Sequence, residues 1–313
     1  MMHIKNQISL LTIITLMISA NLFGQQDAQY TQYMYNMNVI NPAYATDNSD
    51  HINFGLIYRS QWVGAVGAPS TGSFFAHSTI TEKLEGGISI VHDQIGDVVK
   101  DTNLFIDITY VFPVSESAKL SLGVKAGLSF FSTDFNGFVY SDPLPDPAFA
   151  ENLSRVFPNI GAGAFYFTEK FYFGFSVPNM LQSKHLEDDS GIVAEGSEAL
   201  HFFTTGGYVF NINDKLKLKP AFMAKAVIGA PLTLDITSNV LLNDKIEFGL
   251  AYRINDGISG LFNLKISKAI RVGYAYDYTV SNLGRFNSGT HEVMLLFDLF
   301  KSEKGYDKSP RFF

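Results

Sequence analysis

IRVGYAYDYTV, residues 270–280, alternates between two kinds of side chain. Apolar and aromatic residues occupy every second position, and polar or small residues fill the positions between them. The first set is Ile270, Val272, Tyr274, Tyr276, Tyr278 and Val280, and the second is Arg271, Gly273, Ala275, Asp277 and Thr279. Successive side chains of a strand point to opposite faces, so this period of two predicts a β-strand with one apolar and one polar face.

The same alternation recurs in fourteen segments. In one of them, Leu122, Val124 and Leu128 alternate with Ser121 and Lys125. The segments are 51–61, 71–80, 86–95, 102–112, 118–132, 157–168, 171–178, 200–210, 215–228, 231–240, 245–254, 257–267, 269–280 and 290–300. An even number of segments near ten residues long fits strands that cross a membrane as a closed antiparallel barrel.

Alternation alone also fits a soluble β-sandwich, so the composition of the polar face has to distinguish a membrane barrel from a sandwich. That face carries charges of both signs in mid-strand: Arg59, Asp107, Lys125, Lys225, Asp235, Glu247, Arg253, Lys265, Arg271 and Asp277. In a barrel these side chains would line a wet lumen while the apolar face meets lipid. We predict that they form a network of paired ions, with a transport pathway as the alternative. Tyr274, Tyr276 and Tyr278 are then expected at the lipid face and its interfaces.

The connections between segments are unequal at the two ends of the predicted barrel. Connections after even-numbered segments are short, as at 168–170 and 267–268, whereas the two long ones, 133–156 and 179–199, follow odd-numbered segments. Outer-membrane barrels have short periplasmic turns and longer external loops. The sequence therefore predicts an all-β, up-and-down antiparallel barrel of about fourteen strands over residues 51–300, in the outer membrane.

The first 24 residues resemble an export signal. Lys5 supplies a positive charge, residues 8–18 form an apolar run, and the small residues Ala20 and Gly24 follow. The run is shorter than the roughly 20 apolar residues that a membrane-spanning helix needs, which disfavours the alternative of an uncleaved anchor. We expect cleavage behind residue 24. The chain has no cysteine, which excludes a disulfide framework and a lipid-modified cysteine.

Residues 25–50 follow neither a helical nor a strand period, and Asn41-Pro42 favours an extended or turned backbone. We expect this N-terminal segment to be extended and to lie at the periplasmic mouth or in the lumen, hydrogen-bonded to the polar wall. Its candidate plug or partner-binding residues are Gln29, Tyr30, Gln32, Tyr33, Tyr35, Asn36, Asn41, Pro42 and Tyr44. The tail, residues 301–313, is expected in the periplasm, either in contact with a partner or disordered.

Composition and motifs exclude several kinds of function. The net charge is −7 and no basic patch stands out, which argues against nucleic-acid binding. There is no Gly-x-Ser-x-Gly, phosphate-binding loop or His-Glu-x-x-His motif. His92-Asp93 and His291-Glu292 are adjacent in strands and so face opposite ways, which separates base from carboxylate. We expect no enzyme activity, cofactor or metal; weak calcium binding at residues 187–189 is the alternative to a solvated acidic loop.

Several motifs together resemble the PorP/SprF family of type IX secretion system outer-membrane proteins. They are QDAQYTQYMYN (26–36), INPAYA (40–45), RSQW (59–62), GAP (67–69), HDQIG (92–96), GYAYDY (273–278), GTHEV (289–293) and PRF (310–312). The resemblance implies a barrel that supports export or surface attachment of very large adhesins, including those of gliding motility. Its implied partners are the adhesin's C-terminal sorting domain and periplasmic components of the secretion or motility apparatus, together with outer-membrane lipid. No catalytic residue is implied.

Two functions fit the predicted fold. One is a protein-binding barrel that serves secretion and anchoring. The other is a passive channel for a small hydrophobic solute, with the N-terminal segment as a hatch in the lumen. Both need an export signal, a barrel and a segment behind the signal, so the fold alone does not separate them.

Overall fold

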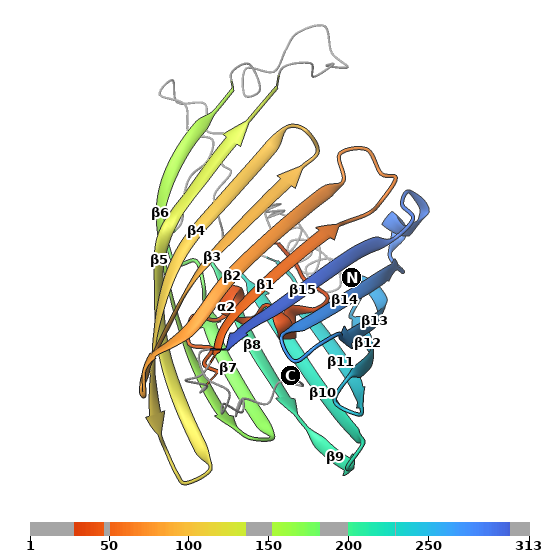
Figure 1. Cartoon of the computed structure of the whole chain (residues 1–313). Coiled ribbons are helices and arrows are strands. Elements are labelled where there is room, and N and C mark those ends of the chain that lie inside the picture. The colour runs from red at the N-terminus through yellow and green to blue at the C-terminus, as the bar shows by residue number, and fades with distance from the viewer. Residues whose placement is uncertain (1–27, 47–50, 136–151, 182–199, 229, 301–313) are drawn as a thin grey trace, which may run out of the picture.

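The computed structural model describes residues 28–46, 51–135, 152–181, 200–228 and 230–300, and these form a single β-barrel with a segment inside it (Figure 1). The strands are β1 His51–Ser60, β2 Pro69–Thr81, β3 Leu84–Ile95, β4 Val99–Pro113, β5 Ala118–Thr133, β6 Ser154–Thr168, β7 Phe171–Val177, β8 His201–Tyr208, β9 Phe210–Asn213, β10 Leu216–Val227, β11 Thr233–Leu242, β12 Ile246–Arg253, β13 Gly257–Lys265, β14 Ile270–Thr279 and β15 Thr290–Phe300. A short 3₁₀ turn, η3 Asn282–Arg285, lies between the last two strands.

The described strands form a closed antiparallel barrel with fourteen strand positions around the ring. Each strand pairs with its neighbours in sequence, and β1 pairs with β15 to close the ring. β8 and β9 both pair with β10 and are separated only by Val209, so together they occupy one strand position. The prediction of a fourteen-strand, up-and-down barrel is confirmed. Several strands begin earlier than predicted; β6, for example, starts at Ser154 instead of residue 157.

The two faces of the wall differ as the alternation predicts. Large apolar side chains are exposed on the outside, among them Ile106, Val124 and Leu250, which are 61%, 61% and 69% exposed. Buried positions on the same strands carry polar or charged residues such as Lys125 and Glu247. Because a closed ring leaves no strand edge unpaired and its outside is apolar, this wall suits the hydrocarbon layer of a membrane.

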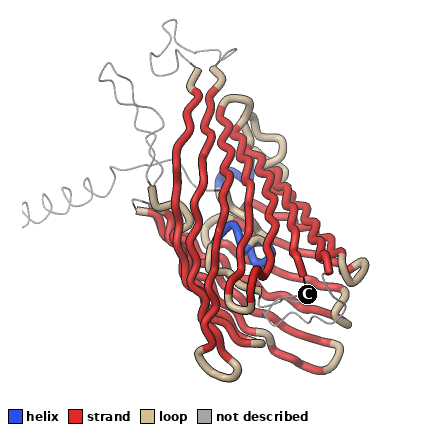
Figure 2. Tube along the Cα trace, turned by 60° about the vertical axis from the view of Figure 1, so that its left-hand side comes forward, coloured by secondary structure: helices blue, strands red, loops and turns tan. Residues whose placement is uncertain are grey.

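The two ends of the barrel are built differently. At one end, tight turns join β2 to β3, β4 to β5, β6 to β7, β9 to β10, β11 to β12 and β13 to β14. We call this the periplasmic end, from the loop asymmetry of outer-membrane barrels, and the opposite end the external end. At the external end, β4, β5 and β6 rise beyond the shorter β7 and β8 (Figures 1 and 2). The predicted long connections fall mostly on residues 136–151 and 182–199, outside the described residues.

Residues 28–46, which we call the plug, lie inside the barrel (Figure 2). All of them except Ala28, Gln29 and Val39 are buried. The plug is more compact than the extended chain that the sequence predicts, because it contains η1 Tyr33–Tyr35 and one turn of helix, α2 Met37–Ile40. Without a neighbouring strand, part of its main chain bonds locally; the Asn41 N–H, for example, donates to Met37 O at 2.7 Å.

The predicted signal peptide, residues 1–24, and the predicted periplasmic tail, residues 301–313, lie outside the described residues, as do 25–27 and 47–50. Among the residues that are described, no helix is both long and apolar enough to span a membrane.

Candidate functional site: the plugged lumen

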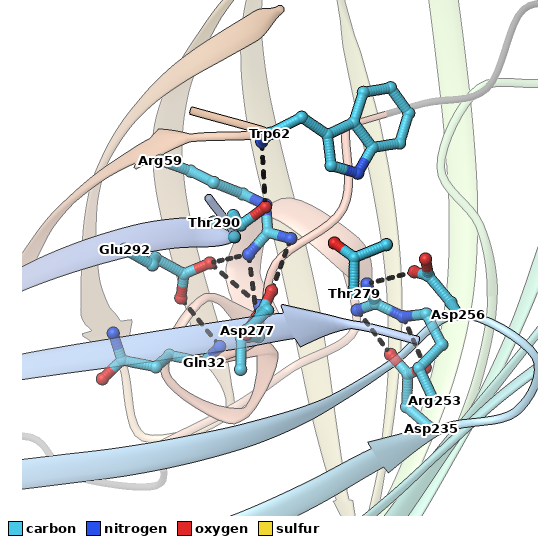
Figure 3. A network of polar contacts seen from close by, with 12 residues as sticks. Gln32, Arg59, Trp62, Asp235, Arg253, Asp256, Asp277, Thr279, Thr290 and Glu292 are labelled. Atoms are coloured by element: carbon cyan, nitrogen blue, oxygen red, sulfur yellow. Dashed lines mark hydrogen bonds and ion pairs between the residues drawn. The ribbon is translucent and has the colours of Figure 1, made fainter. Parts of the chain in front are cut away.

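Glu292 of β15 fastens the beginning of the plug to the wall. Its carboxylate accepts the main-chain N–H groups of Thr31 at 2.9 Å and Gln32 at 2.8 Å. The same carboxylate lies 3.1 Å from Nη1 of Arg59 on β1 (Figure 3). Since Glu292 is fully buried, its charge is balanced by a cation and by two donors from the plug.

Asp277 of β14 completes this contact. It accepts a hydrogen bond from the Thr31 hydroxyl and lies 2.7 Å from Nη2 of Arg59. The Thr31 oxygen in turn accepts from Arg59 Nη1 at 2.8 Å. Thr31, Gln32, Arg59, Asp277 and Glu292 therefore form one network, which we call the anchor cluster.

A second buried glutamate, Glu247 of β12, holds the middle of the plug. It accepts a hydrogen bond from the Tyr35 hydroxyl and another from Asn239 Nδ2 at 2.6 Å, and it lies 3.3 Å from Arg271. Burial and then the Glu247 carboxylate raise the pKa of the Tyr35 phenol well above its usual value. The phenol therefore stays protonated and acts as a donor.

A third glutamate, Glu85 of β3, holds the end of the plug near the periplasmic end. It accepts the Thr46 N–H at 2.8 Å and lies within 3.2 Å of the Thr46 hydroxyl. His77 of β2 lies 3.5 Å from the same carboxylate. Three glutamates on three different strands thus bind the plug at its beginning, middle and end, and Asp277 adds a fourth carboxylate at the beginning.

Side-chain donors of the wall satisfy main-chain carbonyls of the plug. Thr109 donates to Pro42 O and Ser121 to Ala43 O, both at 2.5 Å. Two further donors, Ser176 and Lys125, reach Ile40 O at 2.9 Å and Val39 O at 3.3 Å. A chain without strand partners must have its buried carbonyls satisfied in some other way, and the polar wall provides this.

Wall glycines allow the plug to lie against the sheet. A Cβ on Gly123 would lie 2.1 Å from Pro42 O, and one on Gly163 would lie 2.1 Å from Asn41 Oδ1. Both glycines face the lumen, and neither could carry a side chain without moving the plug. The Asn41 side chain also accepts from Ala43 N–H at 2.9 Å, which fixes the turn at Pro42.

The structure places the nine candidate plug residues in the lumen. Tyr30, Gln32, Tyr33, Tyr35, Asn36, Asn41, Pro42 and Tyr44 are buried, and Gln29 is half-buried. Asn36 donates to Ser73 at 3.3 Å. Tyr44 packs edge-on against Phe165 of the wall, with ring centroids 5.3 Å apart. The plug is therefore held by aromatic packing as well as by polar contacts.

The ten candidate lumen charges fall into several groups. Arg59, Asp277 and Glu247 bind the plug as described above, and Arg271 pairs with Glu247. Arg253 pairs with Asp235 at 2.7 Å and with Asp256 at 3.2 Å (Figure 3). Lys125 lies over the Phe105 ring, 4.1 Å from its centroid, and opposite Asp107 in the β4–β5 register. Lys225 is buried beside a small cavity that Asp235 also lines, and half-buried Lys265 lies opposite Arg271.

Several residues that fasten the plug escaped the sequence analysis, among them Thr31, Thr46, Glu85 and Glu292. Glu292 was considered only as a neighbour of His291. Glu292 lies an even number of positions from Thr290, Met294 and Leu296, which are also buried. This spacing is the signal that its side chain points inward. Thr31 and Thr46 lie in a segment without a period, so no comparable signal marks them.

The arrangement contains no evident catalytic machinery within the described residues. Tyr274 Oη lies 2.7 Å from Nδ1 of His291 on the outer side of the wall, whereas the adjacent Glu292 faces inward. His92 is exposed and lies 2.8 Å from the Thr102 hydroxyl. In the part of the chain that is described, no group of three or more His, Asp or Glu side chains is placed to hold a metal ion.

Comparison with known families identifies the chain. The family described as type IX secretion system membrane protein PorP/SprF matches residues 22–297. The chain belongs to the PorP/SprF family. Together with the closed barrel and its apolar exterior, membership of PorP/SprF makes this protein an outer-membrane component of type IX secretion. PorP/SprF is a family of secretion membrane proteins and not an enzyme class.

Other comparisons add only a general likeness of this PorP/SprF protein to membrane barrels. No curated protein matches the chain. Two solved structures with a similar backbone fold are the Ralstonia pickettii toluene transporter TbuX and the CymD monoaromatic hydrocarbon channel. The match to TbuX has 11% identity, covers 83% of this chain and 92% of that chain, and has a TM-score of 0.47. The match to CymD has 10% identity, covers 85% of this chain and 92% of that chain, and has a TM-score of 0.49. A third is the Acinetobacter baumannii outer membrane protein Omp33 (10%, 80% and 99%, 0.44). Likeness at this level carries no argument about function.

Proposed function

We propose that this PorP/SprF protein supports secretion and cell-surface anchoring of a large adhesin by binding the adhesin's C-terminal sorting domain. In this proposal the barrel is a docking platform in the outer membrane, and its lumen is closed. Periplasmic components of the secretion or motility apparatus are its partners on the other side. Family membership supports the setting in type IX secretion.

The observation that carries the proposal is the way in which the plug is held. Its main-chain N–H groups and carbonyls bond to side chains of β3, β4, β5, β7 and β15, and Tyr35 bonds to β12. A segment bonded on all sides must break many buried polar contacts before it leaves, and each buried group left without a partner costs about 1–3 kcal/mol. A lumen filled in this way favours a binding role over passive transport.

One feature favours the second candidate, a passive channel for a small hydrophobic solute with the plug as a hatch. A cavity of about 120 Å³ lies beside the plug. Its lining includes the apolar residues Val91, Phe105, Phe131 and Phe203. An apolar pocket with a few polar groups is the usual form of a small-molecule site.

Deletion of the gene separates the two candidates. The docking proposal predicts that the adhesin is retained in the cell or shed into the medium, while uptake of small hydrophobic solutes continues at the parental rate. Surface proteolysis of the adhesin and growth on single hydrophobic nutrients measure the two effects. Loss of growth on one such nutrient with the adhesin still in place would contradict the docking role.

Complementation tests whether the plug takes part. A chain lacking residues 29–45 is expected to insert as a barrel but to fail in retaining the sorting domain, because the segment through which the wall would hold the partner is missing. Co-purification of the sorting domain with full-length and shortened barrels measures this directly. Equal recovery with both would show that binding does not depend on the plug.

A further inference from the structure

The two connections beside the closing seam form one hydrogen-bonded unit at the external end. They are residues 61–68, between β1 and β2, and residues 280–289, between β14 and β15, and together we call them the rim. The Val63 N–H donates to Gly289 O at 2.8 Å, and the Ser288 N–H donates to Val63 O at 2.7 Å. A reciprocal pair of main-chain hydrogen bonds therefore joins the two connections.

Threonines of the wall hold the rim in place. The Thr290 hydroxyl accepts a hydrogen bond from the Trp62 N–H at 3.1 Å (Figure 3). The Thr279 hydroxyl donates to Asn287 Oδ1 at 3.3 Å. Each threonine lies two residues from a carboxylate of the anchor cluster, so the rim and the beginning of the plug are fastened to neighbouring parts of the wall.

The main chain of the rim is also fixed in shape. Trp62 has a φ of +48°, a conformation that a residue with a large side chain keeps only when its surroundings impose it. A surface that is already ordered loses little conformational entropy when a partner binds to it. The rim is therefore a preformed surface.

The rim lies on the water side of the membrane boundary. Tyr58, Tyr252 and Tyr278 are exposed on the outer face of the wall, each within two residues of the external end of its strand. Aromatic girdles of outer-membrane barrels mark the boundaries between lipid and water. The rim extends past this girdle, so its side chains face water and not acyl chains.

Apolar side chains of the rim are nevertheless exposed. Val66 is fully exposed, Phe286 is 72% exposed, and Leu283 is nearly half exposed. The one charged residue of the rim is Arg285; it is exposed and forms no ion pair within the described residues. Exposed apolar side chains with polar neighbours mark surfaces that bind other proteins, and aromatic residues and arginine are enriched in such surfaces.

The charge of the rim indicates the kind of partner. A site for lipid phosphates is usually a cluster of several lysines and arginines, whereas the rim has one exposed cation. Arg285 lies next to Phe286 and two residues from Leu283 in the sequence. This combination is complementary to an apolar protein surface that carries a carboxylate.

We propose that the rim is the docking surface for the secreted partner, which contacts the exposed apolar residues of the rim with an apolar surface and Arg285 with a carboxylate. This inference rests on the proposed docking function and deepens it, because it assigns the part of the barrel that the sorting domain contacts. Since the plug and the rim are fastened to neighbouring parts of the wall, loss of the plug would also loosen this surface.

The test measures the affinity of full-length barrels in lipid nanodiscs for the sorting domain of the adhesin that the deletion strain retains or sheds. Phe286→Ser should weaken binding about tenfold, as is common for an aromatic residue at the centre of an interface. Arg285→Gln should weaken it several-fold. Salt above about 0.5 M should weaken binding by the parent more than binding by Arg285→Gln, because it screens the proposed charge contact.

Two control variants make the same kinds of change at the periplasmic end. Val114→Ser lies in the β4–β5 turn and Lys215→Gln in the β9–β10 turn, and both residues are exposed. They should leave the affinity unchanged. Urea unfolding of each variant checks that the barrel is intact.

A photo-crosslinker tests the same surface in intact cells without relying on a change in affinity. Benzoylphenylalanine in place of Phe286 should form a covalent product with the adhesin on irradiation, and in place of Val114 it should not.

The outcomes separate the rim from the docking function. If the parent binds the sorting domain and both Phe286→Ser and Arg285→Gln bind it equally well, the inference is overturned and the docking function stands. A crosslink from position 286 only to lipopolysaccharide, or only to a second copy of this chain, would also contradict the inference. A parent barrel that does not bind the sorting domain would overturn the docking function, and the inference with it.

Discussion

Arg59 and Glu292 lie directly opposite each other in the pairing of the first strand with the last, and their side chains form a buried ion pair at 3.1 Å. This pair crosses the seam at which the barrel closes. Because Glu292 also accepts two N–H groups of the plug, closure of the ring and seating of the plug share one carboxylate.

Glu292→Ala should therefore weaken the closure of the barrel and the seating of the plug at once. Breaking a buried pair by removing one partner costs about 3–5 kcal/mol, and here two plug N–H groups also lose their acceptor. Urea unfolding in lipid vesicles measures the loss. Glu169→Gln, in the exposed β6–β7 turn, is the control and should leave the free energy of unfolding unchanged. Equal stability of both variants would mean that the anchor cluster contributes nothing.

Tyr35→Phe removes the donor that the plug offers to Glu247. The buried carboxylate then loses one partner, and we expect a loss of about 1–3 kcal/mol in the free energy of unfolding. Tyr58→Phe makes the same chemical change on the lipid-facing side, where Tyr58 is 56% exposed, and should have almost no effect. If the two variants unfold alike, Tyr35 is not a point of attachment.

Gly123→Val should push the plug away from the wall, since even its Cβ would lie 2.1 Å from Pro42 O. Overpacking of this kind typically costs about 1–3 kcal/mol. We expect chymotrypsin to cut the plug at its tyrosines in the variant and not in the parent. Gly260→Val, where a Cβ would meet no atom within 4 Å, is the control. A plug that stays resistant in Gly123→Val would contradict the close approach.

Val124→Arg tests the lipid face. Val124 is 61% exposed near the middle of β5, and an arginine facing the membrane midplane costs about 2–4 kcal/mol. Stability and folding yield in vesicles should fall accordingly, whereas Val124→Leu should keep both. An arginine tolerated as well as leucine would place this face in water.

The sequence allowed the strands to be predicted because each obeys a simple period. The alternation in residues 270–280 and 118–132 is enough to assign faces, and mid-strand charges such as Lys125 and Glu247 separate a wet lumen from a soluble core. The prediction of strand ends was less accurate. The strand predicted as 200–210 continues through β9 to Asn213, because its length depends on pairing with β10.

The plug shows where sequence reasoning stops. Its composition indicated a segment that bonds to a polar wall, but its contacts depend on which wall residues lie opposite. Thr46 meets Glu85, and Pro42 fits over Gly123, only because the closed barrel brings these distant positions together. No local period encodes such matches, so the contacts between the anchoring glutamates and the plug could be found only in the structure.

Electrical conductance of the purified barrel in a planar bilayer tests the closed lumen. A fourteen-strand barrel is larger than the eight-strand barrels that side chains fill, so an empty one should pass ions. With the plug bonded to the wall, the full-length protein should show no conductance steps, and the variant lacking residues 29–45 should show discrete ones. Full-length protein that conducts as well as the shortened variant would contradict a lumen closed by this segment.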